Sequence, residues 1–376
     1  MKTIAIFQGY FLPHIGGIER YTYNLAKTLN SKEYRIIIVT TKHKKELKQK
    51  EELEYATVYR LPIYKTFSSR YPIIKKDINY KKTIKELEEE NIDSIILNTR
   101  FQLTTLVGAK FARKNKIPCC VIEHGSSHFT VYNKILDFFG HIYEHLLTNK
   151  IKKLVKNFYG VSNACIEWLK HYKINANGIF YNAIDGQEYD TYKDEIYIKS
   201  ADKKIKLLYA GRLLKDKGIL LLIEAFKELL KKHENIELII AGEGPLKEQI
   251  SKEKNIIYVG NLSHDEIMAL YNQCDIFINP SYSEGMPTSI LEAGLMKCAI
   301  IATPVGGTVE IIEDEKNGIF CDVTIDSIIE KIELLINNKQ LIKTTAENVH
   351  NSILEKFTWR STARNITNNI DYKEEK

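Results

Sequence analysis

Short apolar runs alternate with amphipathic stretches along the first half of the chain. The runs predict strands at Thr3–Gln8, Arg35–Thr40, Thr57–Pro62, Ser94–Asn98, Pro118–Ile122 and Phe158–Val161. The stretches between them predict helices at Gly17–Leu29, Lys75–Glu90, Leu103–Lys114, Asn133–Val155 and Ala164–His171. Repeated strand–helix alternation predicts a parallel sheet with helices on both faces.

The alternation starts again after residues 186–204, a polar stretch that predicts a linker. Further strands are predicted at Lys206–Ala210, Glu237–Ala241, Ile256–Val259, Ile276–Asn279, Ala299–Ala302 and Gly318–Cys321. Further helices are predicted at Lys217–Lys232, Pro245–Ile250, His264–Gln273, Pro287–Lys297 and Thr358–Asp371. The predicted fold class is α/β, with two tandem Rossmann-like domains facing each other across a cleft. We expect the first domain over residues 1–185, with helix 357–376 packing back on it, and the second over 186–356.

Charge is distributed unevenly between these halves. The chain has 376 residues and a net charge of +6, but residues 1–180 hold 30 Lys and Arg against 16 Asp and Glu. A basic half favours an anionic partner such as membrane lipid or a lipid-linked phosphate, although simple solvation of the surface is the alternative. Three Lys-rich patches are the candidates: Lys42–Lys50, Lys75–Lys85 and Lys150–Lys156. We expect the amphipathic segment Asn149–Phe158 to face the membrane. We expect no binding of nucleic acid, because basic motifs interleaved with aromatic residues are lacking.

The cysteines and the first residues point to a cytoplasmic protein. Six cysteines show no metal-ligand spacing, which favours small buried side chains in a reducing compartment. The chain starts with a predicted strand instead of a signal peptide, and no apolar run reaches the roughly 20 residues that span a bilayer. We therefore expect a cytoplasmic location, at the inner face of the membrane if the basic half binds lipid.

The most informative stretch is Ser281–Gly294, which joins a predicted strand to a predicted helix. Glu284 precedes that helix and Glu292 lies about one and a half turns inside it, at 3.6 residues per turn. The unpaired backbone N–H groups at the helix start suit an anion or a hydroxyl-rich ligand. The two carboxylates suit two groups of sugar hydroxyls. On spacing alone, an acidic first turn with one solvated Glu is an equal alternative.

Other strand ends carry glycines, basic residues or histidine. Gly16 and Gly17 follow the first strand, and a turn without further function is the alternative there. Arg212 and Lys217 follow the first strand of the second half, where such a pair suits a diphosphate. His124 follows the strand Pro118–Ile122 and is placed to orient a hydroxyl or exchange a proton. Neither a dinucleotide fingerprint nor a Walker motif is present.

Taken in order, these motifs resemble the retaining glycosyltransferases of family four, formerly group one, which have the GT-B fold. The carrying motifs are Gly16-Gly17, Gly211-Arg212-x4-Lys217-Gly218, Ala241-Gly242-Glu243-Gly244-Pro245, Pro280-Ser281-x2-Glu284-Gly285-x6-Glu292-Ala293 and Val305-Gly306-Gly307-x2-Glu310. The resemblance covers nearly the full length and is loosest over residues 40–120. Each motif alone is weak, whereas the ordered set is specific.

The resemblance implies roles for individual residues. Arg212 and Lys217 would hold the diphosphate of a nucleotide sugar, Glu292 its ribose, and Glu284 the transferred sugar. His124 and Glu284 would be the catalytic residues. The implied donor-binding set is Gly16, Gly17, Arg212, Lys217, Glu284, Gly285, Met286, Pro287, Thr288 and Glu292. Further donor-side residues would be Asn182, Gly242, Gly244 and Glu310. Ala183 departs from the family, in which Gly often follows the Asn, and this weakens the assignment of Asn182.

The implied activity is transfer of a hexosyl or N-acetylhexosaminyl group, with retention, from a nucleotide sugar that we expect to be UDP-linked. The acceptor would be a glycan or a polyprenyl-linked glycan of capsule, exopolysaccharide or lipopolysaccharide synthesis. Fixed cations and helix starts can stabilise the leaving diphosphate, so no metal or other cofactor is expected. Front-face attack is favoured over double displacement through Glu284. The alternatives are a nucleotide-sugar epimerase of the same fold and a non-catalytic nucleotide-binding protein.

Overall fold

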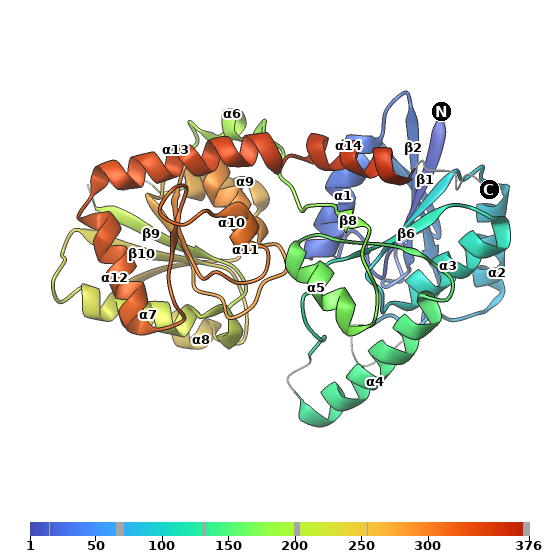
Figure 1. The fold of residues 1–376 in the computed structure, drawn as a ribbon, viewed down its shortest axis with the longest axis horizontal. Coiled ribbons are helices and arrows are strands. Elements are labelled where there is room, and N and C mark those ends of the chain that lie inside the picture. Colours follow the sequence, from blue (N-terminus) through green and yellow to red (C-terminus); the bar gives the residue numbers. More distant parts are fainter. Residues whose placement is uncertain (15, 65–70, 131–132, 199–203, 254, 371–376) are drawn as a thin grey trace. The chain divides into compact units, whose positions relative to one another are not determined.

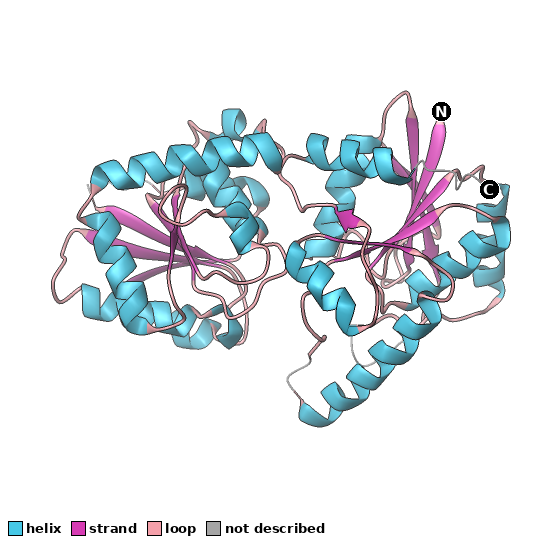
Figure 2. Cartoon of the chain, viewed as in Figure 1, coloured by secondary structure: helices cyan, strands magenta, loops and turns pink. Residues whose placement is uncertain are grey.

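The computed structural model describes residues 1–14, 16–64, 71–130, 133–198, 204–253 and 255–370 (Figures 1 and 2). The chain divides into two compact units. The first comprises Met1–Asn182 and Trp359–Lys376, and the second comprises Ala183–Thr358. The sequence predicts these boundaries after residues 185 and 356, within three residues of the ones observed. Each unit is an α/β layer structure built on its own parallel sheet, which confirms the predicted fold class.

The first unit is built on an eight-stranded sheet in the order β3-β4-β2-β1-β5-β6-β7-β8. Its strands are β1 (Lys2–Phe7), β2 (Tyr34–Thr41), β3 (Lys50–Leu53), β4 (Ala56–Leu61), β5 (Ser94–Asn98), β6 (Cys119–Glu123), β7 (Asn157–Gly160) and β8 (Gly178–Ile179). All neighbours are parallel except β3 and β4. Ile4 pairs with Ile36 of β2 and with Ser94 of β5. The chain reverses its direction across the sheet at β1, where ligands bind in such folds.

Helices cover both faces of this sheet (Figure 1). They are α1 (Gly17–Leu29), α2 (Ile78–Glu89), α3 (Leu103–Asn115), α4 (Lys134–Ile151), α5 (Asn163–His171) and α14 (Trp359–Ile370). α2 to α5 share one apolar core with the strands. α14 packs on α1, with the rings of Trp359 and Tyr21 5.1 Å apart. Thr362 Oγ1 also donates to the carbonyl of Tyr181. The C-terminal helix therefore completes the first unit.

The second unit has a six-stranded parallel sheet in the order β11-β10-β9-β12-β13-β14. Its strands are β9 (Ile205–Ala210), β10 (Ile236–Ala241), β11 (Ile256–Gly260), β12 (Ile276–Asn279), β13 (Ala299–Ala302) and β14 (Ile319–Phe320). The chain winds outward from β9 through β10 and β11, then returns to β12 on the other side of β9. This arrangement places the switch point between β9 and β12, whose carboxyl ends meet there.

Helices also cover both faces of the second sheet (Figure 1). They are α6 (Glu188–Tyr192), the 3-10 helix η1 (Lys215–Lys217), α7 (Ile219–Leu229), α8 (Lys247–Ile250), α9 (His264–Asn272), α10 (Thr288–Leu295), α11 (Thr308–Ile311), α12 (Ile325–Ile336) and α13 (Lys339–Lys356). α7 and α12 share the core below β9 and β10.

Two local predictions differ from the structure. The predicted helix Lys217–Lys232 is split, because Gly218 has a φ of 68° and separates η1 from α7. The predicted linker 186–204 begins with α6, and Gln273 binds the backbone of Tyr197 and Ile198 through its side chain. Residues 199–203 of that stretch lie outside the described residues. The sequence does not predict β3, β8, α11, α12 or α13.

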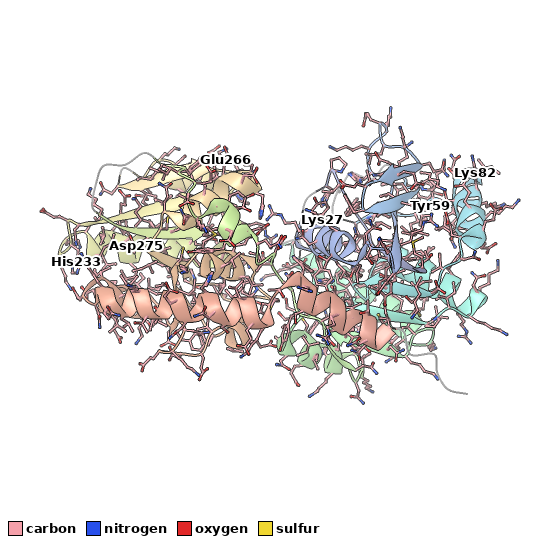
Figure 3. The ribbon with its side chains drawn as sticks, turned by 90° about the horizontal axis from the view of Figure 1, so that it is seen from above. Lys27, Tyr59, Lys82, His233, Glu266 and Asp275 are labelled. Carbon is pink, nitrogen blue, oxygen red and sulfur yellow. The ribbon has the colours of Figure 1, made fainter. Side chains whose placement is uncertain are left out.

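The basic surface belongs to the first unit. Lys27 on α1 and Lys82 on α2 are both exposed (Figure 3). The prediction that Asn149–Phe158 faces a membrane is corrected, however. Ile151, Val155 and Phe158 are each at most 2% exposed, because they pack into the core of the unit.

Candidate active site

The carboxyl ends of β9 and β12 bring together two of the predicted site residues. Lys217 Nζ lies 2.8 Å from Glu284 Oε1, and both side chains are largely buried. Lys217 reaches this place from η1, and Glu284 from the loop that follows β12. The backbone also joins the two segments, because Tyr282 N–H donates to the carbonyl of Asp216 at 2.9 Å. The switch point of the second sheet therefore holds a cation and a carboxylate in contact.

A buried polar network fixes the loop that carries Glu284. Ser281, which is 1% exposed, has its Oγ 2.7 Å from Glu284 Oε1 and 2.6 Å from Asn279 Oδ1. Thr303 Oγ1 donates to the carbonyl of Ser281 at 2.5 Å. Each of these polar groups lies at the end of β12 or β13. Glu284 is therefore a preorganised carboxylate, and this argues against the alternative of an incidental acidic first turn.

A glycine turn after β13 closes against the same loop. Gly306 has a φ of 57°, and a Cβ there would lie 1.8 Å from the carbonyl oxygen of Glu284. Gly307 N–H donates to the carbonyl of Gly285 at 2.7 Å. Only glycine permits both the left-handed conformation and this close approach. Glu310 lies beyond this turn on the short helix α11, where it is half-buried.

α10 carries the second carboxylate of the predicted pair. The helix begins at Thr288. Pro287 is its N-cap residue, whereas the sequence predicts Pro287 as the first helical residue. Met286 is buried beside it. Glu292 is half-buried, and Tyr271 OH of α9 donates to its Oε2 at 3.4 Å. The two carboxylates therefore stand before and within α10, as predicted.

The loop after β9 presents Arg212 to solvent. Its backbone is held from below, because Tyr209 OH donates to the carbonyl of Arg212 at 2.9 Å. Burial raises the pKa of Tyr209, and the nearby Glu284 and Asp216 add to this effect, so the hydroxyl keeps its proton. Arg212 is thus an exposed side chain on a backbone that Tyr209 holds in place.

Gly242 and Gly244 have a packing role in this structure. A Cβ on Gly242, which has a φ of 132°, would lie 1.9 Å from the carbonyl oxygen of Gly211. A Cβ on Gly244 would lie 2.5 Å from the carbonyl oxygen of Leu213. The loop after β10 therefore supports the Arg212 loop through close backbone contact.

In the first unit, His124 follows β6 and is held by a polar network. Its Nε2 lies 3.0 Å from Asn98 Oδ1, and Asn98 Nδ2 donates to Thr22 Oγ1 at 2.8 Å. An amide oxygen only accepts, so Nε2 carries the proton and Nδ1 keeps a lone pair. Burial lowers the pKa of His124 to about 4, which the nearby Glu123 only partly opposes. The ring is therefore a neutral hydrogen-bonding group at neutral pH.

Gly16 and Gly17 begin α1, beside the carboxylate of Glu19, which is not among the site residues predicted from the sequence. Gly16 is the N-cap residue, and a Cβ there would lie 2.4 Å from Glu19 Oε2. A Cβ on Gly17 would meet no atom within 4 Å. His14 Nδ1 lies 3.4 Å from Glu19 Oε1, while burial raises the pKa of Glu19. Asn182, the last residue of the first unit, is buried, and Ala183 begins the second.

Sequence reasoning also missed a buried charged network in the first unit. Arg100 donates to Glu123 Oε2 at 2.7 Å and to Glu144 Oε2 at 2.8 Å, and all three side chains are at most 2% exposed. Glu123 Oε1 accepts from the N–H groups of His124 and Gly125. The position of Arg100 just after β5 was the available signal, since polar residues at strand ends gather at one edge.

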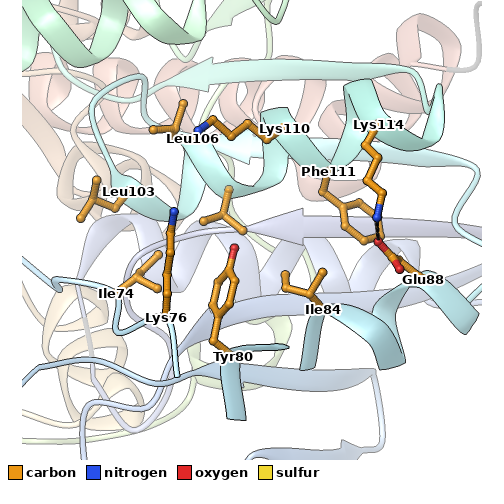
Figure 4. Close-up of a pocket in the computed structure, with 11 residues that line it drawn as sticks. Ile74, Lys76, Tyr80, Ile84, Glu88, Leu103, Leu106, Lys110, Phe111 and Lys114 are labelled. Atoms are coloured by element: carbon orange, nitrogen blue, oxygen red, sulfur yellow. Dashed lines mark hydrogen bonds and ion pairs between the residues drawn. The ribbon is translucent and has the colours of Figure 1, made fainter. Parts of the chain in front are cut away.

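A cavity of about 250 Å³ lies between α2 and α3 (Figure 4). Leu103, Leu106 and Phe111 supply much of its apolar wall, and Lys76 and Lys110 lie on its margin. Lys114, also at this cavity, is paired with Glu88 at 2.5 Å. None of the site residues predicted from the sequence lines it, so it is separate from the site at the strand ends.

Solved structures with the same architecture define the class of the protein. Sucrose-phosphate synthase from Thermosynechococcus elongatus aligns with a TM-score of 0.76 at 15% identity, covering 98% of both chains. HepE of Anabaena, solved in complex with UDP, aligns with a TM-score of 0.73 at 18% identity, covering 98% of this chain and 99% of that one. The fold is that of the GT-B glycosyltransferases.

Two family models match the chain: Glycosyltransferase Family 4 over residues 15–188, and Glycosyl transferases group 1 over residues 192–352. The two matches together cover most of the chain, which therefore belongs to the glycosyltransferases of family four, formerly group one. The resemblance drawn from the ordered motifs is thereby confirmed.

Relatives of the chain include proteins of three organisms. An uncharacterized glycosyltransferase of Methanocaldococcus jannaschii is 29% identical, with 96% of both chains covered. The phosphatidylinositol N-acetylglucosaminyltransferase GPI3 subunit of Saccharomyces cerevisiae is 22% identical, with 96% of this chain and 81% of that protein covered. Alpha-monoglucosyldiacylglycerol synthase of Acholeplasma laidlawii is 26% identical, with coverages of 92% and 91%.

Proposed function

We propose that the protein transfers a hexosyl or N-acetylhexosaminyl group from a UDP-sugar to a lipid-linked glycan acceptor, with retention of anomeric configuration. The observation that carries this proposal is the contact between Lys217 and Glu284 at the switch point of the second sheet. A nucleotide sugar offers both groups what they need, since the diphosphate takes the cation and the sugar hydroxyls take the carboxylate.

The leaving group is a diphosphate, and its growing negative charge needs fixed positive donors. Lys217 is held between Glu284 and the carbonyl of Ser283, which preorganises its charge. Arg212 is exposed and able to fold over phosphate oxygens as a planar fork. The N–H groups at the start of α10 add partial positive charge. This set of donors supports metal-independent transfer.

The two carboxylates divide the recognition of the donor. Glu292 lies inside α10 and is oriented by Tyr271 of α9. It would accept the ribose hydroxyls. Glu284, closer to Lys217, would accept hydroxyls of the transferred sugar. Oε1 of Glu284 already accepts from Ser281 and Lys217, and these bonds reduce its strength as a nucleophile. That engagement favours front-face attack, in which a leaving phosphate oxygen takes the proton of the acceptor hydroxyl.

His124 would act through its neutral ring. With Nε2–H donating to Asn98, the Nδ1 lone pair can accept from a hydroxyl of the donor sugar or of the acceptor. A pKa of about 4 leaves almost no imidazolium at pH 7, so His124 would position a hydroxyl and would not act as a general acid.

The proposal of a lipid-linked acceptor rests on α4. Its outward side exposes six large apolar side chains at helical spacing: Ile135, Leu136, Phe138, Phe139, Ile142 and Leu146. The opposite side buries Glu144, Leu147, Thr148 and Ile151. Such a face suits the boundary between headgroups and acyl chains, and Lys134 and Lys150 at the helix ends suit anionic lipid. The names of two relatives mention lipids as well: phosphatidylinositol and a diacylglycerol.

No helix among the described residues combines the length and the apolar composition that crossing a bilayer requires. A contact through α4 would be peripheral, because the other side of this helix is buried in the first unit. We place the enzyme at the inner face of the cytoplasmic membrane, acting in the synthesis of a cell-surface glycan or glycolipid.

Substitution of Glu284 tests the donor assignment. A panel of nucleotide sugars, screened by thermal shift, first identifies the donor, because ligand binding stabilises the folded state by RT ln(1 + [L]/Kd). Glu284→Gln should then lower turnover of that donor by about 10²-fold or more while the Kd for UDP changes little. Lys217→Ala should weaken the binding of UDP itself.

Glu228→Gln is the matched control, because Glu228 also pairs with a lysine of the second unit, Lys231, but on the surface of α7. It should leave both quantities unchanged. Full turnover by Glu284→Gln would contradict the assignment of Glu284. Conversion of the UDP-sugar alone into a new UDP-sugar would instead identify an epimerase.

A further inference from the structure

Three histidine rings converge in the first unit. His128 lies in the loop after β6, His145 on α4, and His171 at the end of α5. One nitrogen of each ring lies within 4.8 Å of those of the other two. The Nε2 atoms of His145 and His171 are 3.2 Å apart. Three elements that are distant in sequence thus contribute the same kind of metal ligand to one place.

We propose that His128, His145 and His171 bind a divalent transition metal ion of the zinc type. Nitrogen ligands of tetrahedral zinc lie about 2.0–2.1 Å from the metal, and therefore roughly 3.3 Å from one another. The pair His145 and His171 already has this separation. A shift of half-buried His128 that keeps its Nδ1 bonded to Glu144 would close the third side. Three protein ligands would leave a fourth position for water or a further group.

A buried carboxylate supports this assignment from the second layer. Glu144 is 2% exposed, and its Oε2 lies 3.2 Å from His128 Nδ1. The same carboxylate is held by Arg100 at 2.8 Å, by Tyr172 OH at 3.0 Å and by the N–H of Phe129 at 2.8 Å. Metal-binding histidines commonly donate their other ring N–H to a carboxylate, which fixes tautomer and orientation. In the proposed site, Nδ1 of His128 donates to Glu144 and Nε2 binds the metal.

Aromatic rings also hold the cluster in place. The Trp168 ring stacks on His171 at 4.8 Å with an interplanar angle of 5°, and the His141 ring stacks on His128 at 4.0 Å. Stacking already restricts the rotation of these rings, so less rotational freedom is lost when a metal binds. A simple hydrogen bond between His145 and His171 accounts for their 3.2 Å separation, but not for the oriented third ring and its buried carboxylate.

The metal would position the loop that carries His124. Glu144 is joined through Arg100 to Glu123, and Glu123 accepts from the backbone of His124 and Gly125. A metal bound to His128, α4 and α5 would tie down the other end of the same loop. We therefore assign it a structural role in the first unit. This role is compatible with metal-independent chemistry at the donor diphosphate.

Zinc titration of the tag-free full-length protein tests the site. After treatment with a chelator and its removal, calorimetry with Zn²⁺ should show one tight site per chain. His171→Ala should weaken it at least tenfold, and because His171 is exposed, its loss should leave folding intact. Glu144→Gln should weaken it by about 10- to 100-fold. Co²⁺ should give the absorption spectrum of a tetrahedral nitrogen-ligated ion in the wild type but not in His171→Ala.

His233→Ala is the matched control. His233, labelled in Figure 3, also lies beside a carboxylate, with its Nε2 3.2 Å from Glu333 Oε1, but it belongs to the second unit. The control should retain the wild-type affinity for Zn²⁺, and Zn²⁺ should raise the Tm of both proteins. The proposal would be overturned by equal zinc affinities in the wild type and in the double variant His145→Ala/His171→Ala, or by no tight binding in the wild type. UDP affinity, measured alongside, reports on the donor site independently.

Discussion

At the scale of single residues, His124 shows how burial selects one chemical role. The lowered pKa of about 4 removes imidazolium from neutral solution, and the bond to Asn98 selects the tautomer. The sequence showed a histidine at a strand end but not its ionisation, since that depends on packing beneath Tyr21, whose ring lies 4.8 Å away.

The folded pKa of His124, about 4, lies below the ordinary value near 6.5. Between these pH values the unfolded chain binds a proton that the folded chain does not. Stability contributed by the neutral ring is therefore complete above pH 6.5 and is lost as pH falls toward 4, by at most about 3 kcal/mol. Urea unfolding of the wild type and His124→Gln across pH 4–8 should give curves whose difference shrinks toward acid. A constant difference would contradict the buried neutral ring.

At the scale of elements, α4 has two faces with different tasks. The inner face buries Glu144 and Leu147, and the outer face carries the exposed apolar side chains. The sequence predicted this helix but placed the membrane contact at its C-terminal end and beyond, over Asn149–Phe158. Lys-rich composition drew attention to the wrong segment, because composition does not say which apolar residues the core takes.

Vesicle flotation tests the outer face of α4. The wild type should float with vesicles that contain anionic lipid, and part of the binding should persist at high salt, since apolar burial is not screened. Phe138→Gln/Phe139→Gln should lose the salt-resistant part while UDP affinity stays unchanged. Ile78→Gln, which removes a 75% exposed apolar side chain from α2 of the same unit, should behave like the wild type. Absence of flotation by the wild type at low salt would contradict the membrane contact.

Elements with strong periodicity were predictable, and the exceptions have physical reasons. β3 is a short edge strand of charged residues, Lys50–Leu53, whose partner β4 supplies its hydrogen bonds. Charged edges oppose aggregation but give no apolar signal. At the candidate site, the pairing of Lys217 with Glu284 follows from their strand ends lying side by side. The left-handed turn at Gly306 and the packing of Gly242 became evident only from backbone geometry.

At the scale of the whole molecule, the chain order and the structural units differ. The second unit is one continuous segment, Ala183–Thr358, whereas the first needs both Met1–Asn182 and the returning helix α14. Trp359, Thr362, Ala363, Ile366 and Ile370 form the buried side of that helix. Two of its residues, Thr362 and Asn365, also bind the carbonyl groups of Tyr181 and Ile179. The first unit is therefore incomplete until α14 packs against it.

Fragments test this division. Residues 183–358 should unfold cooperatively and bind UDP, because the fragment contains a whole sheet, its core, Arg212, Lys217 and both carboxylates. Residues 1–182 should be less stable than the same unit in the full chain, since the loss of a buried Trp alone costs about 3–5 kcal/mol. Addition of a peptide of residues 359–376 should raise the Tm of that fragment, and a peptide with Trp359→Ala should raise it less. Equal stability of residues 1–182 with and without the peptide would show that α14 is dispensable for the first unit.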